Sequence, residues 1–300
     1  MWEKILADLQ KGDNKALSRS ISFVENEQPG YEELLLSLKW NNNARIIGIT
    51  GPPGAGKSTL VDALIGWLVK DKNKVAVLCV DPSSPFNLGA VLGDRIRMSD
   101  WYVHPDVYIR SLATRGSMGG LHPRIIEISD LLRAAGFDYI IVETVGVGQS
   151  EIEIAGLADT TVVVVVPEAG DEVQTMKAGL MEIADVFVVN KSDRPDADIF
   201  VKNLRLMLAP AFHNHDGAVP VIKTIANTGV GVEELYKIIK DHKKIDGHKN
   251  RIWLLAGHAL QLIQKKRMDS IDRKKLMEDL EKEVTVSRNF NLYRFAKKYF

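Results

Sequence analysis

Residues 45–59 constrain the fold of this chain more than any other stretch. An apolar run over residues 46–50 leads directly into Gly51-Pro52-Pro53-Gly54-Ala55-Gly56-Lys57-Ser58-Thr59, which fits the pattern G-x-x-x-x-G-K-[ST]. Behind it, apolar residues recur at helical spacing, at Leu60, Val61, Leu64, Ile65 and Leu68. A strand, a glycine-rich loop and a helix in this order are typical of a phosphate-binding loop at the edge of an α/β sheet.

The chemistry of this loop predicts how it holds a nucleoside triphosphate. Its glycines allow backbone torsions that a side chain forbids, so successive amide N–H groups can turn toward the phosphates at a helix N-terminus. We expect Lys57 against the β- and γ-phosphates and the Ser58 hydroxyl on magnesium. The predicted nucleotide-binding residues of the loop are Gly51, Pro52, Gly54, Ala55, Gly56, Lys57, Ser58 and Thr59.

The central region alternates apolar runs with amphipathic helical patterns. Further strands are predicted at residues 75–80, 107–112, 139–142, 161–166, 186–189 and 219–225. Several are almost wholly apolar, as strands covered on both faces should be. The predicted fold class is α/β, a mostly parallel P-loop sheet with helices on both faces and helical additions at both ends. In such a sheet, the residues that follow each strand form the ligand edge.

Acidic residues follow two of these strands. Asp81 begins a proline- and glycine-rich loop that also carries Asp94, and Glu143 closes the run at 139–142, as in a Walker B motif. Carboxylate oxygens suit magnesium, so Asp81, Asp94 and Glu143 join Ser58 as predicted metal ligands. For Asp81 a turn-forming role, and for Asp94 an ordinary place in a solvated loop, stay open.

Two later loops could contact the γ-phosphate. Gly146, three residues after Glu143, is predicted to offer its backbone N–H. In Ras-like enzymes a glutamine follows this glycine and orients the attacking water, but here Val147 holds that place; Gln149 is either a substitute or a surface residue. The loop at 167–177 is either a solvated helix start or a catalytic segment whose Lys177 stabilises developing charge.

The run at 186–189 ends in Asn190-Lys191-Ser192-Asp193, an N-K-x-D element. Guanine presents two adjacent donors, and an ionised Asp193 can accept both, whereas adenine has no such pair. We expect Lys191 to lay its aliphatic stem along the ring and Asn190 to tie the loops together. The sequence therefore predicts GTP and GDP as ligands in preference to ATP. The turn at 225–229 either contacts the base or is a simple turn.

Composition excludes several function classes. The chain has 300 residues with 39 basic and 39 acidic ones, so no charge excess favours nucleic acid or a membrane as partner. Its single cysteine, Cys79, lies in an apolar run and is expected to be buried. The sequence has neither a leader pattern nor an apolar stretch of membrane length, so the expected location is cytoplasmic.

Helical patterns flank the central region. We divide the chain into an N-terminal helical extension at 1–43, a nucleotide-binding domain at 44–246 and a C-terminal helical arm at 247–300. The arm either packs on its own domain or completes its core across a dimer.

Together these motifs closely resemble one family. The phosphate loop, D-P-S-S-P from Asp81, G-D-R-I-R-M at 93–98, E-T-V-G-V-G-Q-S-E at 143–151 and N-K-x-D resemble the G3E branch of P-loop GTPases, in particular the MeaB, ArgK and MMAA group. The resemblance implies a homodimeric GTPase that uses Mg²⁺. It also implies a partner, an adenosylcobalamin-dependent acyl-CoA mutase such as methylmalonyl-CoA mutase. The GTPase would gate cofactor delivery to this enzyme and protect it.

The resemblance also implies roles for individual residues. Lys57, Ser58, Asp81, Asp94 and Glu143 would serve phosphate and magnesium. Asp171, Gln174 and Lys177 would belong to a third switch loop, matched on P-E-A-G-D-E-V-Q-x-M-K. With Lys57 and Glu143, these three are the predicted catalytic residues.

Two other functions stay open on the sequence alone. The first is a protein kinase of the ArgK type, although the aspartate and asparagine set of a kinase catalytic loop is not visible. The second is a GTP-dependent binding module that does not hydrolyse GTP, since Val147 replaces the residue that usually orients water. Nickel or zinc insertion is disfavoured because the sequence lacks cysteine clusters and a histidine-rich tract.

Overall fold

The computed structural model describes residues 2–39, 44–81, 98–114, 121–144, 150–169, 178–208, 219–242, 247–268, 271–286 and 291–299. The chain divides into two compact units, Met1–Arg251 and Ile252–Phe300. Among the helices in the described part of the chain, none is both long and apolar enough to cross a lipid bilayer.

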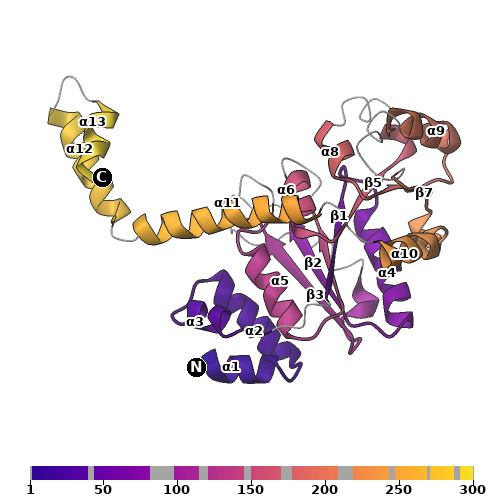
Figure 1. Cartoon of the computed structure of the whole chain (residues 1–300), viewed down its shortest axis with the longest axis horizontal. Helices are drawn as coiled ribbons and strands as arrows, with labels where there is room; N and C mark the ends of the chain where they lie inside the picture. Colours follow the sequence, from indigo (N-terminus) through magenta and orange to yellow (C-terminus); the bar gives the residue numbers. More distant parts are fainter. Residues whose placement is uncertain are drawn as a thin grey trace. The chain divides into compact units, whose positions relative to one another are not determined.

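A seven-stranded sheet forms the centre of the first unit (Figure 1). Its strands are β1 (Arg45–Thr50), β2 (Val75–Asp81), β3 (Val107–Ala113), β4 (Tyr139–Glu143), β5 (Thr160–Val165), β6 (Val186–Val189) and β7 (Val221–Lys223). They lie in the order β3-β2-β4-β1-β5-β6-β7, and all neighbouring strands are parallel. The order reverses around β1, which is where open α/β sheets bind ligands.

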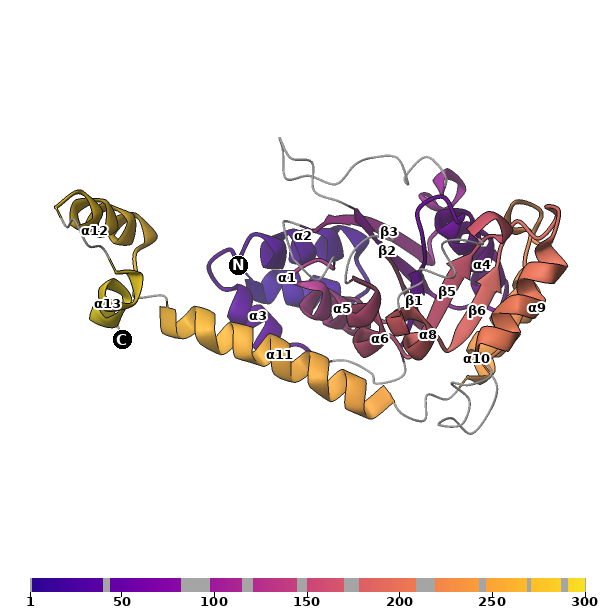
Figure 2. The ribbon, with the colours of Figure 1, turned by 90° about the horizontal axis from the view of Figure 1, so that it is seen from above.

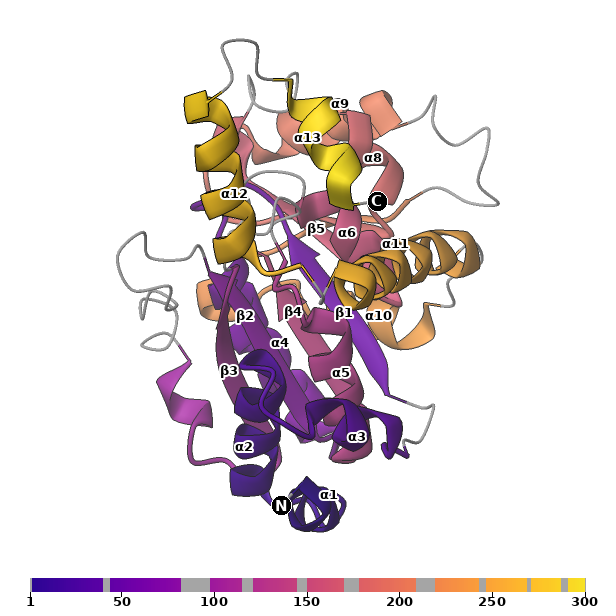
Figure 3. The same cartoon turned by 90° about the vertical axis from the view of Figure 1, so that its left-hand side faces the viewer.

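Helices cover both faces of this sheet (Figure 3). On one face, α4 (Lys57–Lys70) and α10 (Val232–Asp241) share a core with β1, β2 and β5. On the other face lie α5 (Ile125–Ala134), α6 (Ser150–Leu157), α8 (Ala178–Ile183) and α9 (Ala197–Leu208), and α9 runs beside β6 (Figure 2). Right-handed crossovers explain the division, because the chain moves toward one edge of the sheet from β1 to β3 and toward the other edge from β3 to β7.

Alternating strand residues fill these two cores. Val162 and Val164 face α4, whereas Val163 and Val165 face α8 and α9. Gly48 in β1 lets α6 approach closely, because a β-carbon there would lie 2.5 Å from the Ile154 side chain. The near-continuous apolar runs of the sequence are thus explained by burial on both faces.

Three helices precede the sheet: α1 (Trp2–Leu9), α2 (Asn14–Glu25) and α3 (Tyr31–Leu36). Asp13 caps α2, and its carboxylate accepts hydrogen bonds from the backbone N–H groups of Lys15 and Ala16 at 2.6 and 3.1 Å. Arg110 of β3 donates to Ser22 and Glu25 of α2, so this helix is held against the outermost strand of the sheet.

The second unit contains most of α11 (Gly247–Met268), then α12 (Arg273–Val286), α13 (Leu292–Ala296) and the short 3-10 helix η6 (Lys297–Tyr299). Phe295 is buried and its ring lies 5.5 Å from that of Tyr299, whose hydroxyl donates to Asp279 at 3.1 Å. Several large apolar side chains of α11 are exposed, including Trp253 at 69%, Leu260 at 55% and Ile263 at 51%.

The predicted fold class is confirmed, and the sheet is parallel throughout. Cys79 is buried, as expected. The strand predicted at 219–225 is wrong in length, since only Val221–Lys223 pairs with β6. Pro220 has no N–H to donate, and Ile225 instead forms an isolated antiparallel bridge with Val230, so the chain turns away from the sheet after Thr224. The predicted domain boundaries stay predictions.

Candidate nucleotide-binding site

The carboxyl ends of the central strands meet at one edge of the sheet. Ile49 of β1 stands beside Glu143 of β4, and the Thr144 backbone N–H donates to the Ile49 carbonyl at 3.0 Å. The Thr144 hydroxyl donates to that of Thr50 at 2.9 Å, and both side chains are buried. This hydrogen bond joins the ends of β1 and β4 immediately before the phosphate loop. Sequence reasoning missed both threonines because each is an ordinary strand-end residue until the register is known.

The phosphate loop is held by close backbone approaches that only glycine permits. Gly51 has φ 138°, and a β-carbon there would lie 2.0 Å from the Val164 carbonyl oxygen of β5. Gly56 has φ 88°, and its β-carbon would lie 2.4 Å from Nδ2 of Asn190. These positions therefore need glycine for space as well as for left-handed backbone geometry.

Lys57 and Ser58 begin α4 inside this loop, and both are buried. The Lys57 ammonium donates to the carbonyls of Gly51 and Pro52 at 2.9 and 3.1 Å. These two hydrogen bonds fix the positive charge beside the start of the phosphate loop. The Ser58 hydroxyl donates to the Glu143 carboxylate at 2.7 Å. The structure thus brings together three residues that the sequence predicted for phosphate and metal.

The Ser58 and Glu143 pair fits a magnesium ion in chemistry. Hydroxyl and carboxylate oxygens are the hard ligands that Mg²⁺ prefers, and Mg²⁺ in nucleotide sites uses few protein ligands because water and phosphates supply the rest. Glu143 is only 4% exposed, so a cation there would offset the burial of its charge. No group of three histidine, cysteine or acidic side chains suited to a metal occurs within the described residues.

Asn190 joins three segments of the site. Its Nδ2 donates to the Ala55 carbonyl of the phosphate loop at 2.9 Å, and its Oδ1 accepts from the Thr224 hydroxyl and the Ala226 N–H, both at 3.1 Å. Thr224 is fully buried, and no sequence motif marks its contribution. The turn after β7 is the 3-10 helix η5 (Ala226–Thr228), and it is fastened to the N-K-x-D element through Asn190.

Lys191 and Asp193 complete this side of the site. Lys191 has φ 56°, an uncommon value for a residue with a side chain, and its ammonium donates to the Gly54 carbonyl at 2.9 Å. Its stem therefore spans the space between the phosphate loop and the N-K-x-D turn. Asp193 is exposed, which leaves its carboxylate accessible to a ligand. The next residue, Arg194, forms an ion pair with Glu168, which follows β5.

Several predicted site residues lie outside the described residues: Asp94, Gly146, Asp171, Gln174 and Lys177. For Asp81, the backbone is described as the last residue of β2, where it pairs with Ala113, but its side chain is not. Pro52 and Thr59 lie in the phosphate loop and first turn of α4, as their sequence positions require.

The fold and these contacts define the class of protein. A parallel sheet with a phosphate-binding loop after β1, an acidic residue at the end of β4 and an N-K-x-D turn after β6 is the arrangement of a P-loop GTPase. The model of the family described as methylmalonyl Co-A mutase-associated GTPase MeaB matches residues 17–284. The chain therefore belongs to the MeaB family.

Relatives of known sequence agree with this assignment. A GTPase homologue from Pyrococcus horikoshii is 49% identical over 246 residues, which is 81% of this chain and 78% of that protein. The GTPase ArgK of Escherichia coli is 35% identical over 295 residues, covering 95% of this chain and 86% of ArgK. The mitochondrial methylmalonic aciduria type A homolog of Caenorhabditis elegans is 38% identical over 64% of this chain and 52% of that protein.

A solved structure shares the fold over nearly the whole chain. The crystal structure of a protein named LAO/AO transport system kinase has a TM-score of 0.69 and 26% identity, and the match covers 99% of this chain and 95% of that one. With the sequence relatives, it identifies this chain as a GTP hydrolase that binds GTP and GDP.

Proposed function

We propose that this GTPase serves an adenosylcobalamin-dependent acyl-CoA mutase such as methylmalonyl-CoA mutase, gating delivery of the cofactor and protecting the enzyme. The observation that carries the proposal is the family match over residues 17–284, since that family is described as mutase-associated. The name of the Caenorhabditis elegans relative, a methylmalonic aciduria type A homolog, supports the same partner. Cytoplasm is the proposed location.

In the proposed reaction, the described residues bind and orient the nucleotide. The Lys57 ammonium now bonded to two loop carbonyls would turn to the β- and γ-phosphates. Ser58 and Glu143 would hold Mg²⁺, which when bound neutralises charge on the phosphate oxygens. Asp193 would accept the two guanine donors, while Asn190 keeps the loops at a fixed separation.

Further roles come from the sequence motifs and from the family resemblance. Asp81 and Asp94 would add to the metal site, and the Gly146 N–H would bind the γ-phosphate. Asp171, Gln174 and Lys177 would form a third switch loop and would assist cleavage. Their positions relative to the nucleotide rest on the sequence motifs alone.

The test is single-turnover GTP cleavage, measured as phosphate release, with and without purified methylmalonyl-CoA mutase. We expect the mutase to speed cleavage, because a partner that orders the switch loops stabilises the transition state. The Lys57→Ala chain is the control and should lose activity in both conditions. A rate that is the same with and without the mutase would contradict the proposed partner while leaving GTP hydrolysis intact.

A protein kinase function is the second candidate, because one of the solved structures similar to this chain is named as a transport system kinase. It predicts transfer of the γ-phosphate to a protein side chain instead of release to water. Incubation of this chain with labelled GTP and a cell extract, followed by analysis of labelled protein, separates the two. Label found only as free phosphate supports the GTPase.

We also propose a homodimer formed through the C-terminal helices. Trp253, Leu260 and Ile263 on α11 expose large apolar surfaces, which is costly for a helix that stays alone in water. Burying them against a second copy would remove this cost.

A further inference from the structure

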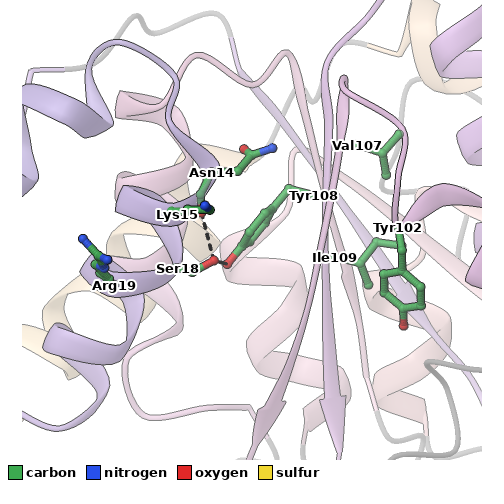
Figure 4. Close-up of a pocket in the computed structure, with 8 residues that line it drawn as sticks. All are labelled: Asn14, Lys15, Ser18, Arg19, Tyr102, Val107, Tyr108 and Ile109. Carbon is green, nitrogen blue, oxygen red and sulfur yellow. Dashed lines mark hydrogen bonds between the residues drawn. The ribbon is translucent and has the colours of Figure 1, made fainter.

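The outer side of β3 carries a groove that has no part in nucleotide binding. β3 is an edge strand, the first in the sheet order, and α2 lies beside it. A hollow of about 500 Å³ lies between them, lined by Lys15, Ser18 and Arg19 from α2 and by Tyr108 and Ile109 from β3 (Figure 4). A second hollow of about 400 Å³ shares Ser18 and Arg19 and reaches Arg110. Together they form what we call the α2–β3 groove.

Residues from both faces of β3 line the first hollow. Tyr108 points toward α2, where its hydroxyl lies 3.2 Å from that of Ser18, whereas Ile109 and Tyr102 lie on the other side of the strand (Figure 4). A hollow that is lined by side chains from both faces of an edge strand must extend around the unpaired edge of that strand. The groove therefore gives access to the backbone of β3.

The backbone of this edge has hydrogen-bonding groups that point away from β2. On the side of β2, the Asp106 carbonyl accepts a hydrogen bond from the Val75 N–H at 2.8 Å. On the outer side, the Val107 N–H donates to the His104 carbonyl at 3.2 Å. Directions alternate along a strand, so Ile109 and Ser111 present their N–H and C=O groups outward. β2 is the one strand that pairs with β3 among the described residues, and both outward residues are partly exposed.

The groove is positively charged. Lys15 and Arg19 form no ion pair with the described side chains, and Arg110 is paired with Glu25. Neither hollow is lined by a carboxylate of the described residues. The nearby Asp13 carboxylate accepts from two backbone N–H groups at the start of α2 and also attracts Lys15 and Arg19, so it offsets their positive charge only in part. If β3 paired with β3 of a second copy, Lys15 and Arg19 of both copies would lie close together. Repulsion between these like charges disfavours such a dimer.

We propose that the α2–β3 groove binds an extended acidic segment of a partner protein, which adds to β3 as a further parallel or antiparallel strand. Ile109 and Ser111 supply main-chain hydrogen bonds, and Lys15 and Arg19 select acidic side chains on the face toward α2. A groove between an edge strand and a helix is a known geometry for strand addition. The site lies along the side of β3 from Val107 to Ser111, whereas the nucleotide residues follow the carboxyl ends of the strands.

The test uses the full chain and a fluorescein-labelled peptide of alternating glutamate and valine, with binding followed by fluorescence anisotropy. Lys15→Glu with Arg19→Glu should weaken binding by about tenfold or more, because charge reversal replaces attraction with repulsion. Lys202→Glu is the matched control, since Lys202 is an exposed lysine on α9. It should leave the affinity unchanged.

A backbone variant tests strand addition separately. Ile109→Pro removes an outward N–H while the ladder to β2 stays intact, and proline is tolerated on an edge strand in this orientation. It should weaken binding of the peptide by about tenfold as well, the loss expected for a main-chain hydrogen bond and its neighbours. The same loss should follow when alternate amides of the peptide are N-methylated. Unchanged GTP affinity in every variant shows that the chain is folded.

Three results would overturn the proposal. The first is no binding of the acidic peptide at millimolar concentration. The second is equal binding of the N-methylated peptide together with displacement by inorganic phosphate, which would make the groove a small-anion site. The third is a change of molar mass in Ile109→Pro by light scattering, which would show that β3 pairs with a second copy.

Discussion

At the scale of single residues, Gly56 shows how the site depends on space as well as on backbone geometry. Its missing side chain leaves room for the amide of Asn190, which in turn holds the phosphate loop to the turn after β7. Sequence patterns identify the glycine, but the neighbour that requires it is 134 positions away in the chain and is revealed only by the fold.

Gly56→Ala tests this contact, with Gly136→Ala as the matched control. Both glycines have positive φ, 88° and 84°, but a β-carbon at Gly136 would meet nothing within 4 Å. Each change should lower the free energy of unfolding by about 1–2 kcal/mol through backbone strain. Gly56→Ala should cost about 1 kcal/mol more, because Asn190 must give up a hydrogen bond, and it alone should weaken GTP binding. Urea unfolding and calorimetry measure the two quantities, and equal losses in both variants would contradict the role of Asn190.

Asp193→Asn tests the assigned base recognition. An asparagine there accepts one hydrogen bond and donates another, so it no longer matches the two donors of guanine but does match xanthine, which has a donor beside a carbonyl. We expect GTP affinity to fall by about 10- to 100-fold, the usual worth of a hydrogen bond to a charged group, and xanthosine triphosphate to bind more tightly. Titration with both nucleotides decides, and an unchanged preference for GTP would place base recognition elsewhere.

At the scale of helices and strands, Arg124 anchors the N-terminal helices to the sheet domain. It precedes α5 and is buried, and its guanidinium donates to Glu127 at 2.7 Å and to Glu27 at 2.6 Å and lies over the Tyr31 ring. Burial alone would lower the pKa of Arg124, but its hydrogen bonds to Glu27 and Glu127 raise it overall. Charge pairing thus holds α2 and α3 to α5.

Arg124→Ala should lower the free energy of unfolding by about 3–5 kcal/mol, because the buried Glu127 carboxylate loses its ion pair with the guanidinium. Residues 2–39 should also become more sensitive to protease. Lys237→Ala is the control, since it removes an exposed ion pair with Glu233 on α10, and solvent screening should make its effect on the free energy of unfolding much smaller. Equal effects of the two changes in urea unfolding would show that the buried network does not anchor the helices.

The contact of α4 with α10 predicts a pH dependence. Tyr236 of α10 stacks on Trp67 and donates to Asp71, and burial followed by this hydrogen bond raises its pKa from 10.0 to about 12. A raised pKa means that the folded state holds the proton more tightly. The contribution of this hydroxyl is therefore complete below pH 10 and is lost as the pH rises through about 12.

Tyr236→Phe measures this contribution directly. The difference in free energy of unfolding between the original chain and the variant should be constant from neutral pH to pH 10 and should shrink between pH 10 and about 12. Urea unfolding at a series of pH values gives this difference. A difference that stays constant to the alkaline limit would show that the pKa of Tyr236 does not change on folding.

At the scale of the whole molecule, the two compact units predict separable roles. A chain ending at Asp246 retains the whole sheet and every described site residue. We expect it to stay folded and to bind GTP, but not to form the proposed dimer, because the exposed apolar side chains of α11 are removed. Light scattering with nucleotide titration is the measurement. A full chain that is monomeric in solution would contradict the proposed dimer. A shortened chain that remains dimeric would exclude the C-terminal helices as the dimer contact.

The sequence by itself determined the class of fold and the chemistry at its edge. Near-continuous apolar runs require strands buried on both faces, and the phosphate loop and the N-K-x-D element are local in the chain, so their residues follow from spacing alone. Both ends of the strand predicted at 219–225 are wrong, because strand ends depend on backbone hydrogen bonds to a distant strand. Apolar character at Val219 and Ile225 does not reveal which backbone groups find a partner.

Only the tertiary structure decided which distant residues meet. The strand order places Glu143 of β4 beside Ile49 of β1, so that its carboxylate reaches Ser58. The same order leaves β3 at the edge of the sheet with α2 next to it. Periodicity and motifs describe neighbours along the chain, whereas register and crossover direction set the neighbours in space, and the Ser58 and Glu143 pair and the α2–β3 groove depend on the latter.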